Sequence, residues 1–170
     1  MKSSRDIRIL TFLSLMLAAT IVLSTIESML PPLPFAPPGV RLGLANVVTM
    51  YVLFFVGKKH ALMLVVLKSV FVVLTRGAIA GALSAVGGIF AVLVIIALTL
   101  VSKRISYILL STAGAMAHNA GQIATASLMV STNLFVLYWP FIVIFGVLLG
   151  CVTGKILEIV IPYLSKHRPM

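Results

Sequence analysis

Polar side chains inside strongly apolar stretches are the part of this sequence whose chemistry needs an explanation. Lys68 stands near the middle of such a stretch, with Lys59 before it and Arg76 after it. A lysine at mid-depth in a bilayer costs about 2.5–3.5 kcal/mol on insertion scales, and intramembrane ions are therefore usually functional. We predict that Lys68 faces a cavity. Pairing with Glu27 and snorkelling to a surface are the structural alternatives.

A second polar group, formed by His118, Asn119 and Gln122, stands within the apolar stretch 107–130. His118 and Gln122 are four residues apart and share one helical face, and Asn119 is one turn from Gln122. A lone buried histidine is usually hydrogen-bonded to another helix, but contacts between helices rarely need three such side chains. We interpret the group as ligand contacts, with hydrogen bonding between helices as the alternative.

The elements that position these residues are membrane helices. The chain has 170 residues, of which 61% are hydrophobic and 9% charged. Soluble domains are roughly half apolar and about a quarter charged, so lipid must be the solvent for much of this surface. The first apolar stretch is too long for a signal peptide, and we expect an uncleaved helix. We predict an all-α, polytopic membrane protein with one integral domain over residues 1–170 and a bundle of six transmembrane helices, at approximately 7–30, 41–56, 61–75, 78–101, 107–130 and 140–164.

Two of these predicted helices are short, and a proline-rich loop precedes the first of them. The segment 31–39 contains five prolines and cannot be helical. The stretch 41–56 gives a helix of roughly 22 Å against a ~30 Å hydrocarbon core, and 61–75 is similar. Short segments often mark a cavity in a membrane protein. A locally thinned bilayer is the alternative. The stretch 78–101 could begin with a re-entrant turn at 77–81.

Basic residues predict the orientation of the bundle, because cytoplasmic loops are enriched in lysine and arginine. With the N-terminus in the cytoplasm, six crossings also place the C-terminus there. The outer loops then hold only Arg41 and Arg76. Lys155 and Glu158, one turn apart, are predicted to pair. The inner segments hold Lys2, Arg5, Arg8, Lys58, Lys59, Lys103, Arg104, Lys166 and Arg168.

This topology gathers the polar residues in the outer half of the bundle, under the proline-rich loop. Positive charges there outnumber the one acid, Glu27, so we expect an anionic ligand such as a phosphate, diphosphate or carboxylate compound. No cofactor is expected. The predicted ligand-binding residues are Arg41, Asn46, Lys68, Arg76, His118, Asn119, Gln122 and Glu27.

The scarcity of acids and cysteines excludes several classes of function. Asp6, Glu27 and Glu158 are the three acidic residues, and Cys151 is the one cysteine. Acid–base catalysis by paired carboxylates and carboxylate-bound magnesium need acids that converge, so a self-contained enzyme is not expected. The net charge of +10 comes from clusters at the ends of apolar stretches rather than from a continuous basic stripe, which argues against nucleic-acid binding.

Small residues recur at four-residue spacing and predict close packing of helices. Gly146, Gly150 and Gly154 form such a stripe, and Ala117 and Gly121 form a shorter one. Small residues at this spacing let neighbouring helices approach closely. We interpret these stripes as contacts within the bundle. A weaker pair, Ser14 and Ala18, lies on the first helix and could meet a partner protein.

Three segments carry a resemblance to a known family. They are Gly39–Asn46 (GVRLGLAN), Leu83–Gly88 (LSAVGG) and Gly114–Gln122 (GAMAHNAGQ). They resemble the bacterial family called heptaprenyl diphosphate synthase component I, or Gx transporter family, and the likeness extends over almost the whole chain. In size and topology that family is similar to the substrate-binding S components of energy-coupling factor (ECF) transporters. The resemblance implies six helices, an outward pocket capped by the first loop, and a first helix whose small residues contact the transmembrane coupling subunit; Ser14 and Ala18 match that pattern loosely.

The family's name implies isoprenoid synthesis, but the residues argue against catalysis. Prenyl synthases resemble one another in two aspartate-rich magnesium motifs, and this chain has the single aspartate Asp6. It is therefore not expected to be the catalytic subunit. A non-catalytic accessory role remains an alternative. Because relatives of the family are linked to flavin-dependent extracellular electron transfer, an isoprenoid-, flavin- or quinone-like ligand is conceivable.

Three readings follow for a multi-pass protein of the bacterial cytoplasmic membrane. The favoured one is a substrate-binding transport subunit, with ECF-type transmembrane and ATPase subunits as partners. The second is a membrane accessory subunit of heptaprenyl diphosphate synthesis or of a flavin or quinone redox system. The third is a structural scaffold. The sequence contains no P-loop, so active transport would need energy from another subunit or from a gradient.

Overall fold

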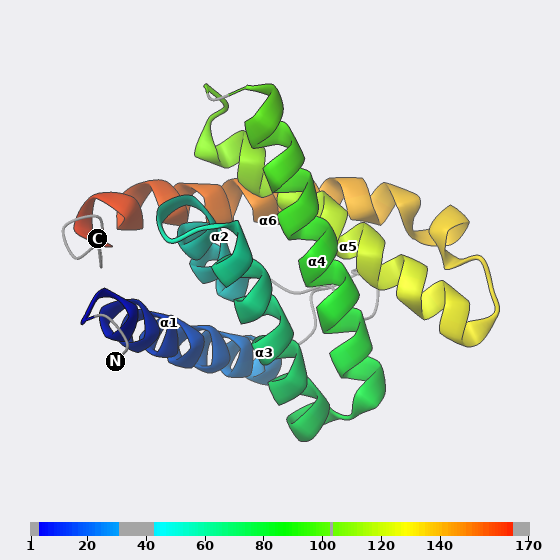
Figure 1. The fold of residues 1–170 in the computed structure, drawn as a ribbon. Helices are drawn as coiled ribbons and strands as arrows, with labels where there is room; N and C mark the ends of the chain where they lie inside the picture. Colours follow the sequence, from blue (N-terminus) through cyan, green and yellow to red (C-terminus); the bar gives the residue numbers. More distant parts are fainter. Residues whose placement is uncertain (1–3, 31–42, 103, 165–170) are drawn as a thin grey trace.

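The computed structural model describes residues 4–30, 43–102 and 104–164, and every regular element in these ranges is an α-helix (Figure 1). The shortest connection among the described residues is the single residue Gly77 between α3 and α4. Its φ of 90° favours glycine, because a side chain strains the backbone there. The helices are α1 (Ser4–Met29), α2 (Leu44–Phe55), α3 (Lys58–Arg76), α4 (Ala78–Val101), α5 (Tyr107–Val130) and α6 (Leu134–Leu164).

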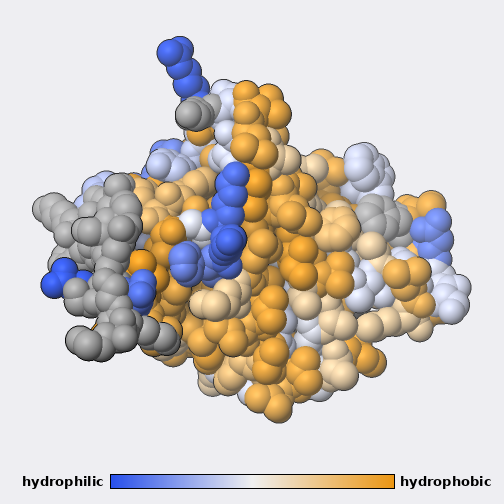
Figure 2. Space-filling model, viewed as in Figure 1, coloured by the Kyte–Doolittle hydropathy of each residue, from blue (hydrophilic) through white to orange (hydrophobic). Residues whose placement is uncertain are grey.

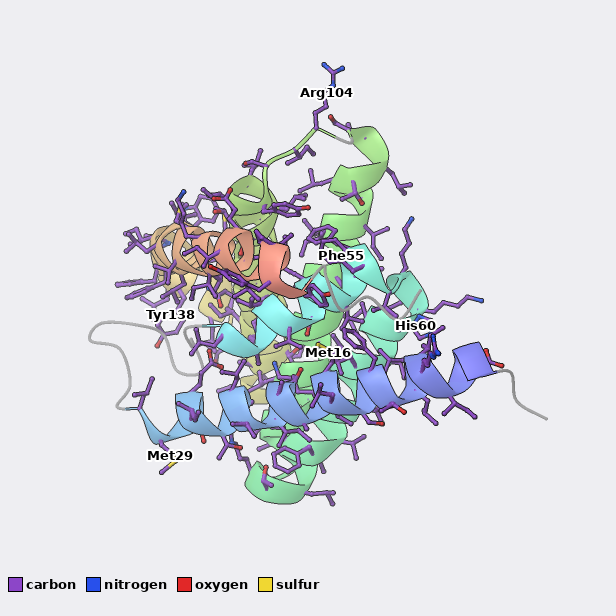
Figure 3. All side chains as sticks on the ribbon, turned by 90° about the vertical axis from the view of Figure 1, so that its left-hand side faces the viewer. Met16, Met29, Phe55, His60, Arg104 and Tyr138 are labelled. Atoms are coloured by element: carbon purple, nitrogen blue, oxygen red, sulfur yellow. The ribbon has the colours of Figure 1, made fainter. Side chains whose placement is uncertain are left out.

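Neighbours in sequence pack on one another, and α2 lies at the centre of the assembly. Each helix contacts the next along the chain, most extensively α5 with α6, α4 with α5 and α3 with α4. The short α2 also contacts α4 and α6. Its Tyr51 and Val52 are almost fully buried. Figure 3 shows Met16 of α1 between α1 and α2, whereas Met29 and Arg104 extend away from the helices.

The outer surface is apolar, as expected of a protein that is solvated by lipid. Hydrophobic residues cover most of the face in Figure 2, and hydrophilic ones are confined to small patches. Within the described part of the chain, three helices are long and apolar enough to cross a bilayer, over Asp6–Met29, Ala78–Val101 and Val136–Tyr163. The protein is therefore a helical membrane protein, which confirms the class predicted from composition.

Two predicted helices, 78–101 and 107–130, coincide with α4 and α5. Gly77 ends α3 and precedes α4, and Ser106 caps α5 by accepting a hydrogen bond from the Leu109 amide through its side chain at 3.3 Å. α4 is continuous from Ala78, so the suggested re-entrant turn is absent from this helix. The first helix ends at Met29, one residue before the predicted end.

The other boundaries need correction. α3 begins at Lys58 and has 19 residues, or roughly 28 Å, so the prediction of a short third helix was wrong. The prediction left residues 58–60 outside the helix, although lysine is a good helix former. α6 begins at Leu134 instead of Pro140, and Pro140 lies inside the helix. α2 has 12 residues and begins after Gly43.

Glycines let α5 and α6 approach each other closely, which confirms the packing role predicted for the stripe on α6. A methyl group at Gly150 would lie 2.3 Å from Thr112 Cα. At Gly154 it would lie 2.6 Å from Ile108 Cα. The backbones themselves are thus in contact, as in small-residue interfaces of membrane helices. Gly121 of α5 meets α4 in the same way, since a methyl group at Gly121 would lie 3.1 Å from Gly87 Cα.

Candidate functional site

A polar cavity of about 170 Å³ opens where several helix ends meet. The ends of α1 and α3, the starts of α2 and α4, and the second half of α5 enclose it. These ends lie together because successive helices run in opposite directions. We call this space the polar cavity. Its lining residues are Ser24, Glu27, Gly43, Asn46, Lys68, Val72, Arg76, Ala80, Leu83, Ser84, His118 and Gln122.

The polar cavity brings together most of the ligand-binding residues predicted from the sequence. Six of the eight, drawn from α1, α2, α3 and α5, line it. Arg41 lies outside the described residues, and Asn119 does not line the polar cavity. The six are Glu27, Asn46, Lys68, Arg76, His118 and Gln122.

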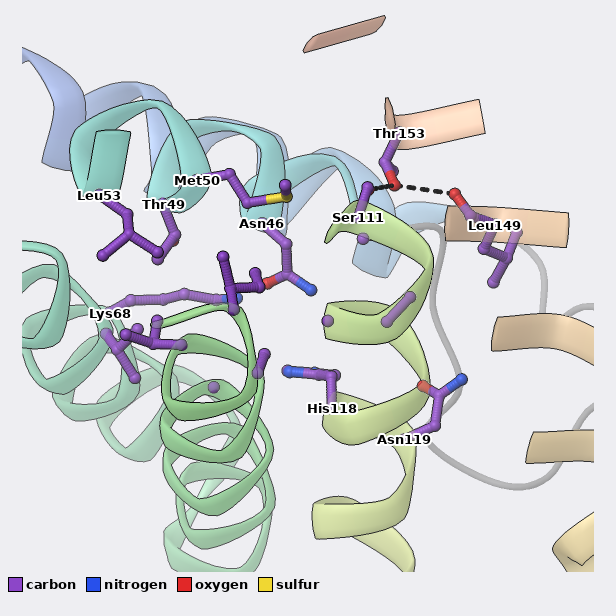
Figure 4. Close-up of a pocket in the computed structure, with 18 of the residues that line it drawn as sticks. Asn46, Thr49, Met50, Leu53, Lys68, Ser111, His118, Asn119, Leu149 and Thr153 are labelled. Carbon is purple, nitrogen blue, oxygen red and sulfur yellow. Dashed lines mark hydrogen bonds between the residues drawn. The ribbon is translucent and has the colours of Figure 1, made fainter. Parts of the chain in front are cut away.

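Lys68 and His118 are positioned from opposite walls. Lys68 is 9% exposed, and its side chain extends from α3 toward Asn46 and His118 (Figure 4). The Nδ1 atom of His118 is buried and has no hydrogen-bond partner among the described residues. An unsatisfied buried polar atom costs about 1–3 kcal/mol. A ligand that hydrogen-bonds to the Nδ1 atom of His118 would therefore relieve this cost.

Gly87 of α4 makes room for the His118 imidazole. A methyl group at Gly87 would lie 3.1 Å from Cε1 of the ring and 2.9 Å from both the His118 backbone oxygen and Gln122 Cγ. The glycine therefore allows α5 to approach α4 with the two polar side chains between them. Gly87 lies in the LSAVGG segment, and a larger residue there would displace the ring.

Two of the charged residues also hold helix ends in place. One oxygen of Glu27, which is 8% exposed, accepts a hydrogen bond from the Leu44 amide, the first of α2. A carboxylate at a helix N-terminus is favourable because it satisfies a free amide and complements the helix dipole. Arg76 donates through Nη2 to the Ser24 backbone oxygen at 2.7 Å, which ties the end of α3 to α1.

A smaller chamber of about 30 Å³ adjoins the polar cavity on the side toward the middle of the bundle. We call it the deep chamber. Gly43, Asn46, Lys68, Ser84 and His118 line both spaces and form their shared boundary. Beyond these residues the wall is largely aliphatic, formed by Met50, Leu53, Val65, Ala91, Val92, Ile95 and Leu149.

Hydroxyl groups in the deep chamber are satisfied within the protein. Ser111 and Thr153 are hydrogen-bonded to each other at 2.7 Å, and Thr153 also donates to the Leu149 backbone oxygen at 2.8 Å (Figure 4). Thr49 donates to the Ala45 backbone oxygen. Because these hydroxyl groups already have partners, a molecule in the deep chamber need not hydrogen-bond to them.

Asn119 shares the deep chamber with Asn46, Lys68 and His118 but not with Gln122. It lines the deep chamber, is 4% exposed, and points away from Lys68 toward α6 in Figure 4. Because it follows His118 directly in the helix, the two side chains are turned about 100° apart. The prediction placed Asn119 with Gln122 because the two are one turn apart, but Gln122 lines only the polar cavity.

Sequence reasoning missed the serines of the polar cavity. Ser84 on α4 lines both spaces, and its hydroxyl lies 3.4 Å from that of Ser69 on α3. Ser24 contributes its backbone oxygen to Arg76. A usable signal existed for Ser84, because it lies within the LSAVGG segment, four residues after Ala80 on the same face of α4. Ser24 carries no comparable signal.

The predicted partner contacts Ser14 and Ala18 are both exposed on α1. Ser14 donates to the Leu10 backbone oxygen and borders a small groove between α1 and α3, away from the polar cavity. The pair thus faces the surroundings of the bundle. Lys155 and Glu158 form the predicted ion pair on α6, with a distance of 3.2 Å.

The polar cavity carries a small excess of positive charge. Among its described lining residues, Lys68 and Arg76 stand against the carboxylate of Glu27, a net charge of +1 with neutral histidine. The described part of the chain holds no cluster of three or more His, Cys, Asp or Glu side chains that could hold a metal ion. Amide, imidazole and cationic groups around one space are suited to holding an anion.

The fold and the cavity together define a helical membrane protein with an internal polar site. The heptaprenyl diphosphate synthase component I family matches residues 16–160, and the chain belongs to this family. This confirms the resemblance drawn from the three segments. No curated protein and no solved structure matches the chain.

Proposed function

We propose that this protein is a ligand-binding subunit of a membrane transport system, similar in role to an ECF S component, and that it holds a small anionic compound in the polar cavity. One observation carries the proposal: Lys68, Arg76, His118 and two amide side chains line a single space inside an otherwise apolar bundle. Each of these groups is costly to bury in hydrocarbon, so their presence around one space indicates that they bind something there.

The size of the polar cavity favours a small ligand. One water molecule needs roughly 10–15 Å³ of the same measure, so a cavity of about 170 Å³ holds on the order of ten waters. A compact anion with its first hydration waters fits this space. The buried Nδ1 of His118 supports the same proposal, because a ligand in the cavity could supply its missing hydrogen bond.

Transport requires the bundle to span the membrane, and we propose six crossings of the bacterial cytoplasmic membrane with both termini inside. α3 and α5 are roughly 28 and 36 Å long, enough for a hydrocarbon core of ~30 Å. In this orientation the polar cavity faces outward and most basic residues face the cytoplasm. Energy would come from ECF-type transmembrane and ATPase subunits, and the exposed Ser14 and Ala18 are the proposed contacts.

Native mass spectrometry of gently purified protein tests the proposal directly. We expect the wild-type chain to carry a bound anionic compound, and Lys68→Met to lose it. Lys59→Met is the matched control, because it removes an exposed lysine from the same helix. Retention of the compound by Lys68→Met, or recovery of an intact but empty wild-type protein, would contradict the proposal. An ATPase complex that copurifies with the chain would support the ECF-type partners.

The topology has its own test. In a Cys151→Ala background, Thr132→Cys between α5 and α6 should react with a membrane-impermeant maleimide in intact cells. Ser102→Cys between α4 and α5 should react only after permeabilisation. Both positions are exposed. The reverse pattern would invert the orientation, and equal labelling of the two would contradict a complete crossing by α5.

The family match favours a second candidate function, that of a non-catalytic membrane partner of a prenyl diphosphate synthase. The family's description names one component of such a synthase, which implies a second. In this reading the chain would hold an isoprenoid, flavin or quinone compound for a catalytic partner. A soluble synthase that copurifies with the chain, and whose product changes when the chain is absent, would favour this function over transport.

A further inference from the structure

The two adjoining spaces differ in lining, and this difference limits the shape of the ligand. Lys68 and His118, whose Nδ1 is unsatisfied, stand at the boundary that the two spaces share, and Arg76 lines the polar cavity alone. Beyond this boundary the wall of the deep chamber is largely aliphatic; Asn119 also lines it, and the hydroxyls of Ser111 and Thr153 are already bonded to each other. A polar ligand group gains hydrogen bonds in the polar cavity and gains little in the deep chamber.

We propose that the ligand is a small amphipathic anion whose charged group lies beside Lys68 and His118 and whose short apolar end enters the deep chamber. This inference rests on the proposed binding function and names the class of compound bound. Lys68, His118 and Asn46 line both spaces, so a single molecule that contacts them can occupy both.

Volume limits the apolar end to a few carbon atoms. The deep chamber measures about 30 Å³, against about 170 Å³ for the polar cavity. By the same measure one water needs roughly 10–15 Å³, so the chamber takes roughly two or three heavy atoms. A long hydrocarbon tail does not fit there unless the walls separate, because packed interiors resist added volume.

Binding of alkyl phosphates to the detergent-solubilised full chain tests the inference. The probes are inorganic phosphate, methyl phosphate, propyl phosphate and hexyl phosphate, compared by isothermal titration calorimetry. Each buried methylene tightens binding roughly fourfold, so propyl phosphate should bind roughly fifteenfold more tightly than methyl phosphate. Hexyl phosphate should bind no more tightly than propyl phosphate, because the chamber is full.

A matched pair of variants locates the apolar end. Ala91→Leu fills the deep chamber, since Ala91 lines it and is 7% exposed. Ala97→Leu makes the same change on the exposed face of α4. Ala91→Leu should keep the affinity for inorganic phosphate and lose the gain from the propyl group, and Ala97→Leu should behave as wild type. The comparison of methyl, propyl and hexyl phosphate uses the wild-type chain, so it still tests the inference if Ala91→Leu fails to fold.

The outcomes separate the two proposals. If no phosphate compound binds, the proposed anion-binding function fails. If inorganic and propyl phosphate bind equally, the binding function stands and the amphipathic ligand is wrong. A continued gain from propyl to hexyl phosphate would also overturn the inference, because it would place the apolar end in lipid instead of the deep chamber.

Discussion

Replacing Gly150 by alanine tests how closely α5 and α6 approach in the structure. The new methyl group would lie 2.3 Å from Thr112 Cα and 2.9 Å from the Thr112 nitrogen. Carbon atoms in contact are normally about 3.5–4.0 Å apart, so the two helices would have to separate by roughly 1.2 Å. Backbone atoms cannot turn aside as a side chain can, and the strain would spread along the interface.

Three contributions determine how much Gly150→Ala lowers the free energy of unfolding. Overpacking of this kind costs about 1–3 kcal/mol. Separation would also stretch the 2.7 Å hydrogen bond between Ser111 and Thr153, which contributes about 0.5–1.5 kcal/mol. Alanine is favoured over glycine within a helix by about 1 kcal/mol, which offsets part of the loss. We expect a net destabilisation of about 2 kcal/mol.

Gly146→Ala is the matched control, one turn earlier on α6. Its methyl group would first meet Met116 Cγ, at 2.4 Å. The methionine side chain is flexible and can move aside, and Met116 Cα, at 3.1 Å, requires a backbone shift of only a few tenths of an ångström. The gain in helix propensity and the cost of repacking therefore nearly cancel, to within about 1 kcal/mol. Unfolding in mixed detergent micelles with increasing dodecyl sulfate, followed by far-UV circular dichroism, measures both. If Gly150→Ala unfolds no more easily than Gly146→Ala, the backbone contact between α5 and α6 is wrong.

Three further predictions concern polar contacts. Glu27→Ala should destabilise the fold by about 1–3 kcal/mol, because it leaves the first amide of α2 without its partner. Glu27→Gln keeps an acceptor and should lose about 0.3–1 kcal/mol in the same unfolding assay, and equal losses for the two variants would argue against the cap. Thr153→Val should cost about 1 kcal/mol in that assay through the lost bond to Ser111, and an unchanged midpoint would count against this bond. Lys155→Ala should change stability by less than about 0.5 kcal/mol because its pair with Glu158 is exposed, and a larger loss would show a stronger role for that pair.

Much of the helical framework could be predicted because residues that end or cap helices stand at its boundaries. Gly77 and Ser106 mark the starts of α4 and α5, and both ranges were predicted as found. The start of α6 was missed because the prediction began this helix at Pro140, whereas α6 begins at Leu134. Proline is tolerated further inside a membrane helix, where neighbouring groups satisfy the freed carbonyl. The predicted number of crossings and the orientation stay predictions.

The gathering of polar residues was predictable from depth alone, but their individual contacts were not. Helix lengths and alternating directions suffice to bring Lys68, Arg76 and His118 to the same end of the bundle. The hydrogen bond from the Leu44 amide to Glu27 joins residues 17 apart, and that from Arg76 to Ser24 joins residues 52 apart. Such contacts depend on the rotation of each helix about its axis, which hydrophobic patterning leaves open in a chain that is apolar on nearly every face.

The enclosure of Lys68 has a consequence for the ionic strength at which an anion can be held. Dissolved salt weakens attraction between exposed charges over a Debye length of about 8 Å under physiological conditions, but it acts far less on charges that ions in solution cannot reach. Lys68 is almost completely covered by helices that themselves present hydrocarbon to their surroundings. Once an anion fills the polar cavity, ions in solution can weaken this attraction only by displacing it. Retention should therefore depend less on ionic strength than binding to an exposed lysine would.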